Sequence, residues 1–537
     1  MIRSDAQREI RFNPAWQLTV VPDETVRAAH FAPQTLAQVQ AGGYLTVPAA
    51  VPGNFELDLV NAGVLEEPFF STRLIDMQAL EDRHLYYTAV FDRPETEKGE
   101  TLSLLFLGID TVCEIYLNGE KVAENRNMFV PVEISCEGLG TAGNEIVVHI
   151  IPACIATRDI PLTPLTHAMK YNYAALALRK AAYMYGWDIV PRAVSAGIWK
   201  PVFFVARRAT YFSDLFLYTS KLREDHSHAD LTLFWQFHTE HADIRRFRIR
   251  VEGLHGTSDF SGEERCFHTA GNLNFGIHFP HLWWPKNAGD PTLYDVCVYL
   301  YDGDELLDTA RFKTGIRTGE LDRTSTTDVE GNGEFCFKIN HKKIFCMGTN
   351  WVPLDAYPSQ NPKRLPQALD LLDDVGANII RLWGGNVYED DALFDFCDAH
   401  GIMIWHDFSM ACAYYPQDEA FCAELRREVQ YQVKRVRNHP ALIVWAGDNE
   451  CDQTSVWFGD PNDNVLTRKV IPEVLRNEDF SRPYLPSSPY VSGEAFMTVV
   501  ARGTATLQET TKTGAEGAKT FDVIGVEAAI GEIETPE

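Results

Sequence analysis

Short hydrophobic runs separated by turn residues fill the first 210 positions of the chain. Residues 85–92 and 101–108 are two of these runs, rich in the β-branched and aromatic residues that are typical of strands. Asn118 and Gly119 follow a further run and give a strong hairpin signal, because both residue types tolerate a positive φ. The pattern predicts a jelly-roll β-sandwich over residues 1–210.

The strand pattern continues over residues 211–318. Runs such as ADLTLFWQF and LYDVCVYLY have the length and the β-branched and aromatic content of strands. This region predicts a second and smaller sandwich of the immunoglobulin-like type.

Apolar strands alternate with amphipathic helices in the region that follows. Residues 343–350 form a strand-like run, and residues 362–376 carry leucines at helical spacing. A longer helical pattern extends from Glu419 to Arg437, and residues 483–488 could add a fifth strand. Strict alternation with apolar strands indicates a parallel sheet, for which a (β/α)8 TIM barrel is the best fit. Because a complete barrel takes about 250 residues, residues 319–496 predict an incomplete one.

The pattern changes again in the last segment, residues 497–537. Phe521 is its one aromatic residue, and Thr, Ala, Gly and Glu dominate without a helical or strand period. We interpret this segment as a weakly structured tail and the chain as cut short within its barrel. A shift of reading frame near residue 496 is one interpretation of that change.

Composition and charge narrow the class of protein. The net charge of −27 disfavours nucleic acid and anionic membranes as partners and favours a soluble protein that acts on neutral or cationic ligands. The 11 cysteines show no CxxC or metal-ligand spacing, which predicts free thiols in a reducing compartment. The N-terminal residues lack an apolar signal segment, and no run of about 18 apolar residues occurs. A cytoplasmic location without a membrane span is therefore expected, and the oligomeric state stays open.

Trp, Arg, Asn and Glu residues follow the ends of four consecutive predicted barrel strands. Aromatic faces can bind the C–H surface of a sugar, while amides, Arg and carboxylates can bind its hydroxyls. In (β/α)8 barrels the active site is built at these C-terminal ends. Taken singly, a strand-end Glu is more often a surface group, a Trp a packing residue and an Arg a structural ion-pair partner. His406 and His439 are interpreted as scaffold, since no metal-ligand spacing exists. Four adjacent strand ends together favour a binding site, formed by Asn350, Arg381, Trp383, Trp405, Asn449 and Glu450.

With these residues in view, the chain resembles glycoside hydrolase family 2, and within it the β-mannosidases, over roughly residues 10 to 495. The motifs that carry the resemblance are LGIDTVCEIYLNG, HLWWPKNAGDPTLYDV, FCMGTNWVPLDAYP and NHPALIVWAGDNE. The last motif resembles the family's acid/base segment. The resemblance implies that Glu450 is the general acid/base and that Asn449 binds the sugar 2-hydroxyl.

The mannosidase assignment rests on a further segment, RKAAYMYGWDIVP. It resembles the pattern in which the sandwich contributes an Asp to the sugar pocket. This implies that Asp188, with Trp187 beside it, binds the sugar. The chain departs from the family at three positions. Ile189 stands where the family often has Trp, His406 where it commonly has Gln, and Asp448 where it commonly has Asn or a small residue. These departures leave other family 2 activities open, namely β-galactosidase, β-glucuronidase and exo-β-glucosaminidase.

The resemblance implies an exo-acting retaining hydrolase that releases terminal β-D-mannose from β-mannoside oligosaccharides, without a metal or cofactor. A retaining mechanism needs a second carboxylate about 5–5.5 Å from the first. The family places that nucleophile in a segment resembling S-E-x-G, far beyond the acid/base. Glu494 lies too early in the chain, and no matching motif surrounds the acids of the tail. The nucleophile is therefore unassigned. The alternative function is a catalytically dead sugar-binding fragment. The tail acids are Glu527, Glu532, Glu534 and Glu537.

Overall fold

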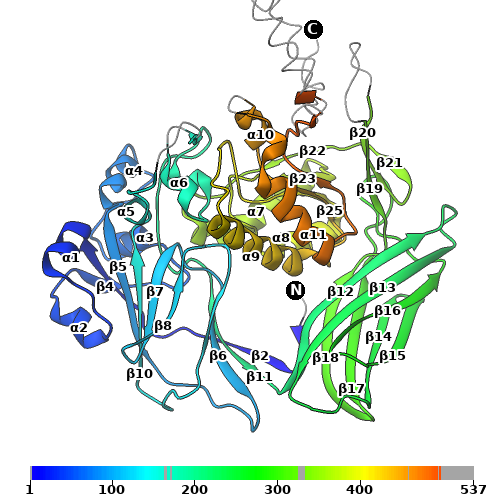
Figure 1. The fold of residues 1–537 in the computed structure, drawn as a ribbon, viewed down its shortest axis with the longest axis horizontal. Helices are drawn as coiled ribbons and strands as arrows, with labels where there is room; N and C mark the ends of the chain where they lie inside the picture. Colours follow the sequence, from blue (N-terminus) through cyan, green and yellow to red (C-terminus); the bar gives the residue numbers. More distant parts are fainter. Residues whose placement is uncertain are drawn as a thin grey trace, which may run out of the picture.

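The chain folds into two antiparallel β-sandwiches and a parallel sheet with helices (Figure 1). A computed structural model describes residues 3–161, 166–169, 172–324, 333–456, 459–493 and 495–496. In Figure 1 the first sandwich is blue to cyan, the second green, and the parallel sheet with its helices yellow to orange. Among the residues described, no helix combines the length and the apolar character needed to cross a membrane.

The first sandwich packs a six-stranded sheet, in the order β4-β3-β5-β10-β7-β8, on a four-stranded sheet, β2-β11-β6-β9. The predicted hairpin is confirmed, since Asn118 and Gly119 join β7 to β8 with φ values of 49° and 86°. Its strands are β2 (Gln7–Arg11), β3 (Gln17–Pro22), β4 (Thr46–Pro48), β5 (Arg83–Phe91), β6 (Thr101–Phe106), β7 (Val112–Leu117), β8 (Glu120–Asn125), β9 (Val132–Ser135), β10 (Asn144–Ile151) and β11 (Val202–Arg207). Its short helices are α1 (Asp23–Ala29), α2 (Leu36–Ala41), α3 (Phe55–Asn61), α4 (Arg73–Asp76), η1 (Met77–Leu80), α5 (Ala153–Ala156), α6 (Ala174–Ala177) and η3 (Ala182–Tyr185).

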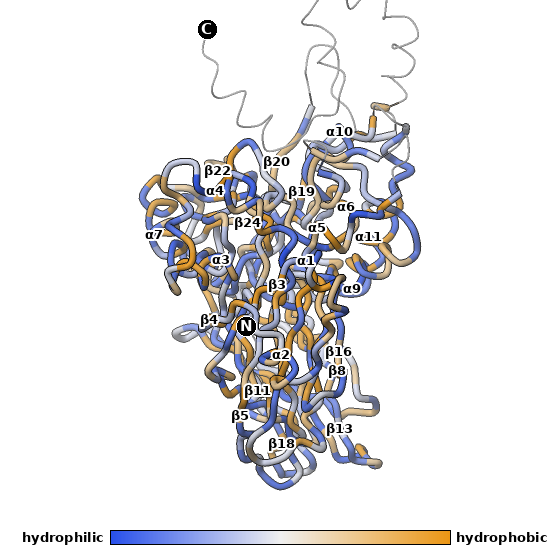
Figure 2. Tube along the Cα trace, turned by 90° about the vertical axis from the view of Figure 1, so that its left-hand side faces the viewer, coloured by the Kyte–Doolittle hydropathy of each residue, from blue (hydrophilic) through white to orange (hydrophobic). Residues whose placement is uncertain are grey.

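The second sandwich packs the sheet β12-β13-β16 on the sheet β1-β18-β17-β14-β15. Hydrophobic and hydrophilic positions alternate along the strand-rich lower part of the molecule, as expected where one face of each sheet is buried (Figure 2). The N-terminal strand β1 joins this distant domain, because Arg3 pairs with Arg311 of β18. The strands are β1 (Arg3–Ser4), β12 (Thr210–Leu222), β13 (His228–Thr239), β14 (Phe247–His255), β15 (Ser258–Arg265), β16 (Ala270–His278), β17 (Tyr294–Asp302) and β18 (Glu305–Thr314).

Five parallel strands in chain order, β22-β23-β24-β25-β26, form the third sheet. The predicted helices at residues 362–376 and 419–437 are confirmed as α7 and α9, while the fifth strand is shorter than expected. The elements are β22 (Gly348–Trp351), η4 (Pro358–Gln360), α7 (Asn361–Asp374), β23 (Ile379–Leu382), α8 (Asp391–His400), β24 (Met403–Asp407), α9 (Glu419–Val436), β25 (Leu442–Ala446), α10 (Cys451–Ser455), η5 (Pro461–Asp463), η6 (Leu466–Val470), α11 (Ile471–Glu478) and β26 (Tyr484–Leu485).

The single strand expected over residues 343–350 is wrong, since the structure divides it. β21 (Lys342–Ile344) pairs antiparallel with β20 (Phe335–Ile339), which pairs with β19 (Gly319–Arg323), whereas β22 pairs parallel with β23. Asn378 fixes the break, because its side chain donates to the carbonyl of Phe345 at 2.9 Å and accepts from the amide of Met347 at 2.8 Å. A local apolar run cannot show that its two ends pair with different sheets.

A buried ion pair joins the first sandwich to the parallel sheet. Arg179 of the sandwich donates through Nη2 to Glu428 of α9 at 2.7 Å, and both side chains are at most 3% exposed. Asn127 also donates to Glu428, at 3.1 Å, and Tyr388 donates to its other oxygen at 2.7 Å. The second guanidinium contact of Arg179 is the carbonyl of Ser409, at 2.7 Å. The loop that follows β24 is thereby fixed to the sandwich.

Two buried acids support the turn between β25 and α10. Asp448 accepts hydrogen bonds from Ser487 and from the amide of Cys451, and its second oxygen has no partner among the described residues. Asp452 forms an ion pair with Arg468 at 2.6 Å. Burial, and then the charge of Asp452, raises the pKa of Asp448 well above its usual range.

Replacement of Arg179 by Met should destabilise the folded chain by about 3–5 kcal/mol, because Glu428 would be left charged and buried without its partner. Urea denaturation of the parent and the variant measures this change. Arg245→Met is the matched control: Arg245 also pairs with an acid, Asp243, but both side chains are more than half exposed. The control should change stability by less than about 1 kcal/mol. Equal effects of the two substitutions would contradict the stabilising role of the buried Arg179–Glu428 ion pair.

Replacement of Asp448 by Asn should flatten the pH dependence of stability. The folded protein keeps a proton on Asp448 that the unfolded chain releases above about pH 4, so the free energy of unfolding falls as pH rises until Asp448 ionises in the folded state. The variant lacks this titration, and its loss of stability between about pH 5 and pH 8 should be smaller by about 1–2 kcal/mol. Denaturation at several pH values in this range measures the free energy of unfolding of each protein. Asp463→Asn, at an exposed position, is the control and should show the pH dependence of the parent. An Asp448→Asn variant with that same pH dependence would contradict the prediction.

Candidate active site

The loops that follow β24, β25 and β26 are tied together by backbone hydrogen bonds. Asn449 donates its amide to the carbonyl of Met410 at 2.9 Å and accepts from the amide of Cys412 at 2.8 Å. On the other side, Glu450 donates its amide to the carbonyl of Ser488 at 2.9 Å. Short parallel bridges thus extend the sheet past its strand ends and hold the backbone of Glu450 from both sides.

Glu450 is held at the start of α10 in an unusual backbone conformation. Its φ is 59°, in the left-handed region, which costs a residue with a Cβ on the order of 1–2 kcal/mol. The side chain is half-buried, and its Oε2 lies 3.0 Å from Sγ of Cys412. The strained turn directs one carboxylate into a partly open position beside a thiol.

Arg381 connects three of the predicted strand ends. Its guanidinium donates to Asp407 at 2.7 Å, to Oδ1 of Asn449 at 2.7 Å and to Oδ1 of Asn350 at 3.2 Å. Asp407, in turn, accepts from the indole of Trp405 at 3.0 Å. Burial raises the pKa of Asp407 to about 6, and the charge of Arg381 acts in the opposite direction. The network fixes the two asparagine amides relative to each other.

A segment of the first sandwich lies against the same end of the parallel sheet. The rings of Trp187 and Trp383 pack edge to face with centroids 5.1 Å apart. Tyr183 donates its amide to the carbonyl of Gly385 at 3.1 Å. Asp188 follows Trp187 and is exposed to solvent. The two domains therefore share one wall, with an unburied carboxylate at its edge.

The structure brings most of the predicted residues together but changes the place of Trp405. Asn350, Arg381, Asn449 and Glu450 lie in one continuous set of contacts, and Trp187 meets Trp383 beside them. The ring of Trp405 is fully buried against Phe335 and Phe337, which leaves no ring face for a sugar. The expected sugar contact at Trp405 is thus replaced by a supporting contact with Asp407.

The structure adds two residues to the predicted set: Asp407, which lies at a predicted strand end, and Cys412. Cys412 lies five residues beyond the end of β24, so the strand-end rule applied to a longer loop would have included it. His406 was interpreted as scaffold, and its Nδ1 lies 2.8 Å from the carbonyl of Asp407 in a fully buried position. Burial lowers the pKa of His406 to about 3.

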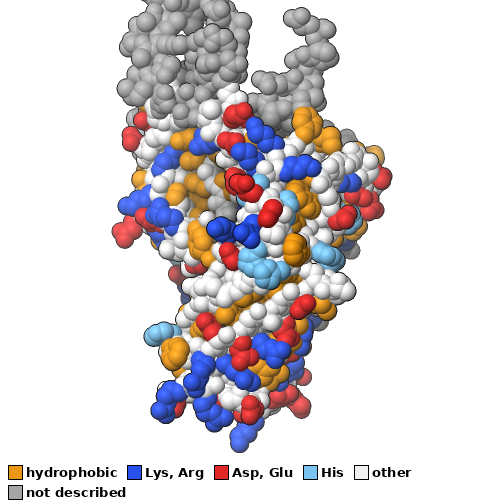
Figure 3. Space-filling view, turned by 90° about the vertical axis from the view of Figure 1, so that its right-hand side faces the viewer, with side chains coloured by type: hydrophobic (Ala, Val, Ile, Leu, Met, Phe, Trp, Pro, Cys, Tyr) orange, Lys and Arg blue, Asp and Glu red, His pale blue; other side chains and the backbone are white. Residues whose placement is uncertain are grey.

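Two surface features lie outside this region. Acidic and basic side chains are intermixed on the face shown in Figure 3, so the negative charge is not gathered there into a single patch.

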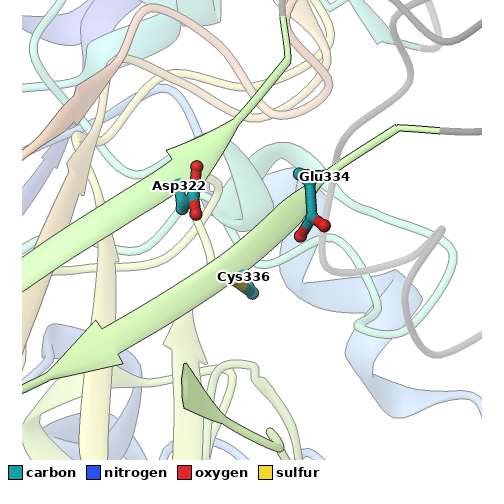
Figure 4. A group of neighbouring side chains, drawn as sticks. All are labelled: Asp322, Glu334 and Cys336. Carbon is teal, nitrogen blue, oxygen red and sulfur yellow. The ribbon is translucent and has the colours of Figure 1, made fainter. Parts of the chain in front are cut away.

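Asp322, Glu334 and Cys336 approach one another on β19 and at the start of β20 (Figure 4). Lys338 binds Asp322 at 2.6 Å and Lys343 binds Glu334 at 2.9 Å, so lysines already balance both carboxylates.

Glu494 and the segment after residue 496 lie outside the described residues. The prediction of a weakly structured tail and the four tail glutamates fall in this part of the chain. The second carboxylate therefore remains without an assigned residue.

Comparison with known proteins identifies the family of both sandwiches. Residues 26–200 match the glycosyl hydrolase 2 galactose-binding domain-like family, and residues 210–317 match glycosyl hydrolases family 2. Beta-mannosidase B of Aspergillus clavatus is 31% identical over 481 residues, which cover 84% of this chain and 55% of the relative. The Aspergillus fumigatus protein of the same name is 30% identical over 480 residues, with the same coverage. The chain thus spans about half the length of these relatives.

Solved structures show the same likeness. The Beta-D-Mannosidase of Dictyoglomus thermophilum aligns with a TM-score of 0.78 and 29% identity, covering 91% of this chain and 58% of the other. The exo-chitosanase CsxA of Amycolatopsis orientalis aligns with a TM-score of 0.63 over 90% of this chain and 53% of its own, but at 17% identity it shows only a shared fold. With two successive family 2 domains and these relatives, the chain belongs to glycosyl hydrolase family 2.

Proposed function

We propose that this chain carries the acid/base part of an exo-acting retaining β-mannosidase, which releases terminal β-D-mannose from oligosaccharides. The observation that carries the proposal is the pairing of Asn449 and Glu450 at the end of β25, with Glu450 half-buried and held by the neighbouring loops. Strands β22 to β26 are parallel and lie in chain order, which supports the assignment of this sheet to part of a (β/α)8 barrel. Active sites of such barrels lie at the C-terminal ends of the strands, where Glu450 is found.

In the proposed reaction Glu450 first donates a proton to the glycosidic oxygen as the leaving group departs. It then takes a proton from the water that hydrolyses the glycosyl intermediate. Asn449 hydrogen-bonds the sugar 2-hydroxyl, and Arg381, which also donates to Asn350, keeps that amide in place. The nucleophilic carboxylate stays unassigned, since the candidates Glu494 and the tail acids lie outside the described residues.

Sugar recognition is proposed to come from both domains. The contact between Trp187 and Trp383 supports this, because it brings the segment of Asp188 to the edge of the parallel sheet. Asp188 would accept hydrogen bonds from sugar hydroxyls, while the two tryptophans offer apolar surface to the sugar ring. The names of the relatives favour mannose over the other sugars of the family.

Hydrolysis of 4-nitrophenyl β-D-mannopyranoside by the 537-residue chain tests the proposal. Glu450→Gln should lower turnover by about 100-fold or more, the usual contribution of a general acid/base. Glu419→Gln, an exposed acid on α9, is the matched control and should leave turnover unchanged. A folded chain without turnover would overturn the proposal for this chain, and calorimetric mannose binding in that sample would favour the sugar-binding alternative.

Asp188→Asn should lower kcat/KM for the β-mannoside by about tenfold or more, because a sugar hydroxyl would lose a charged acceptor. Measuring kcat/KM for a β-galactoside, a β-glucuronide and a β-glucosaminide ranks these three substrates of the family against the β-mannoside. Asp159→Asn, an exposed position in the same sandwich, serves as control. Unchanged kcat/KM in Asp188→Asn would remove Asp188 from the sugar site.

A further inference from the structure

The thiol of Cys412 lies between the two residues of the proposed acid/base segment. Sγ is 3.0 Å from Oε2 of Glu450 and accepts from the side-chain amide of Asn449 at 3.4 Å. Cys412 is buried, whereas the carboxylate it contacts is half-buried. The sulfur therefore contacts one oxygen, Oε2, of a side chain that is only half-buried.

The backbone around this thiol is fixed on several sides. Cys412 has a φ of 43°, and its amide donates to the carbonyl of Asn449 at 2.8 Å. The preceding residue, Ala411, donates its amide to the hydroxyl of Tyr415 at 3.1 Å. Further back, the carbonyl of Ser409 accepts from Arg179 of the first sandwich. A loop held in this way sets the position of the sulfur before any substrate binds.

The surroundings of Cys412 make its thiol a proton donor. Burial, and then the charge of Glu450, raises the pKa of Cys412 well above its ordinary value, so the thiol is neutral. The other titratable groups that face it are Asp448 and Cys451 from the Glu450 turn and Tyr415 from its own loop. With Asn449 donating to the sulfur, the S–H bond is directed toward Glu450.

We propose that Cys412 is a positioning residue for Glu450, holding its carboxylate in one orientation by a hydrogen bond from the thiol. This proposal rests on the proposed acid/base role of Glu450. A donor to the ionised carboxylate stabilises that form, which aids the second half of the reaction, when Glu450 must accept a proton from water. Cys412 itself forms no covalent bond in this scheme.

The pH profile of kcat/KM distinguishes this role from a merely structural one. Cys412→Ala removes the hydrogen-bond donor to the Glu450 carboxylate, so the alkaline limb of the profile should move to higher pH. Cys412→Ser keeps a donor and should keep the limb near that of the parent. Cys422→Ala, whose thiol contacts the carbonyl of Gln417, is the control. A limb that stays in place in Cys412→Ala overturns the proposal.

Alkylation tests the contact itself in the full-length chain, independently of turnover. Glu450→Gln removes the charge that suppresses the thiolate, so the rate of Cys412 modification by iodoacetamide should rise about tenfold for each unit by which the thiol pKa falls. Peptide mass spectrometry follows Cys412, and Cys422 in the same sample should react at an unchanged rate.

The two measurements separate the two proposals. A chain that hydrolyses no mannoside but shows faster Cys412 alkylation in Glu450→Gln loses the proposed function and keeps the thiol–carboxylate contact. Equal alkylation of Cys412 in both proteins overturns the contact, whether or not the chain turns over substrate.

Discussion

The buried ion pair between Arg381 and Asp407 is the interaction on which the candidate site depends. Both side chains are at most 1% exposed, so neither charge could persist there without its partner. The remaining guanidinium donors of Arg381 are directed at the amides of Asn350 and Asn449. One charged group thereby links the strand ends that carry Asn350, Asp407 and Asn449, and Glu450 follows directly from the last of them.

The first sandwich is part of the site's construction as well as a neighbour of it. Arg179 reaches α9 and the loop after β24, while Trp187 packs on Trp383. These contacts hold the segment of Trp187 and Asp188 against the end of the parallel sheet that carries Glu450. This is the arrangement that a site needs when substrate recognition and proton transfer come from different domains.

The acids around Glu450 have different surroundings and therefore different behaviour. Asp448 lies buried, one of its oxygens has no partner within the described ranges, and it keeps its proton, whereas the half-buried Glu450 contacts a neutral thiol. Neighbouring carboxyl groups with such contrasting environments can take separate roles, one structural and one in proton transfer. Glu450 has a left-handed backbone, and its half-buried side chain contacts Cys412.

The sequence by itself determined the secondary structure that carries the site. Periodicity predicted α7, α9 and the parallel strands, and the residues at their ends contained Asn350, Arg381, Asn449 and Glu450. These features depend on neighbours within a few positions, which a local pattern records. Only the tertiary structure decided the division of the strand at residues 343–350, the burial of Trp405 and the contact of Cys412 with Glu450. Those outcomes depend on residues far apart in the chain, such as Cys412 and Glu450 at a separation of 38 positions. No local pattern of polarity encodes such a separation.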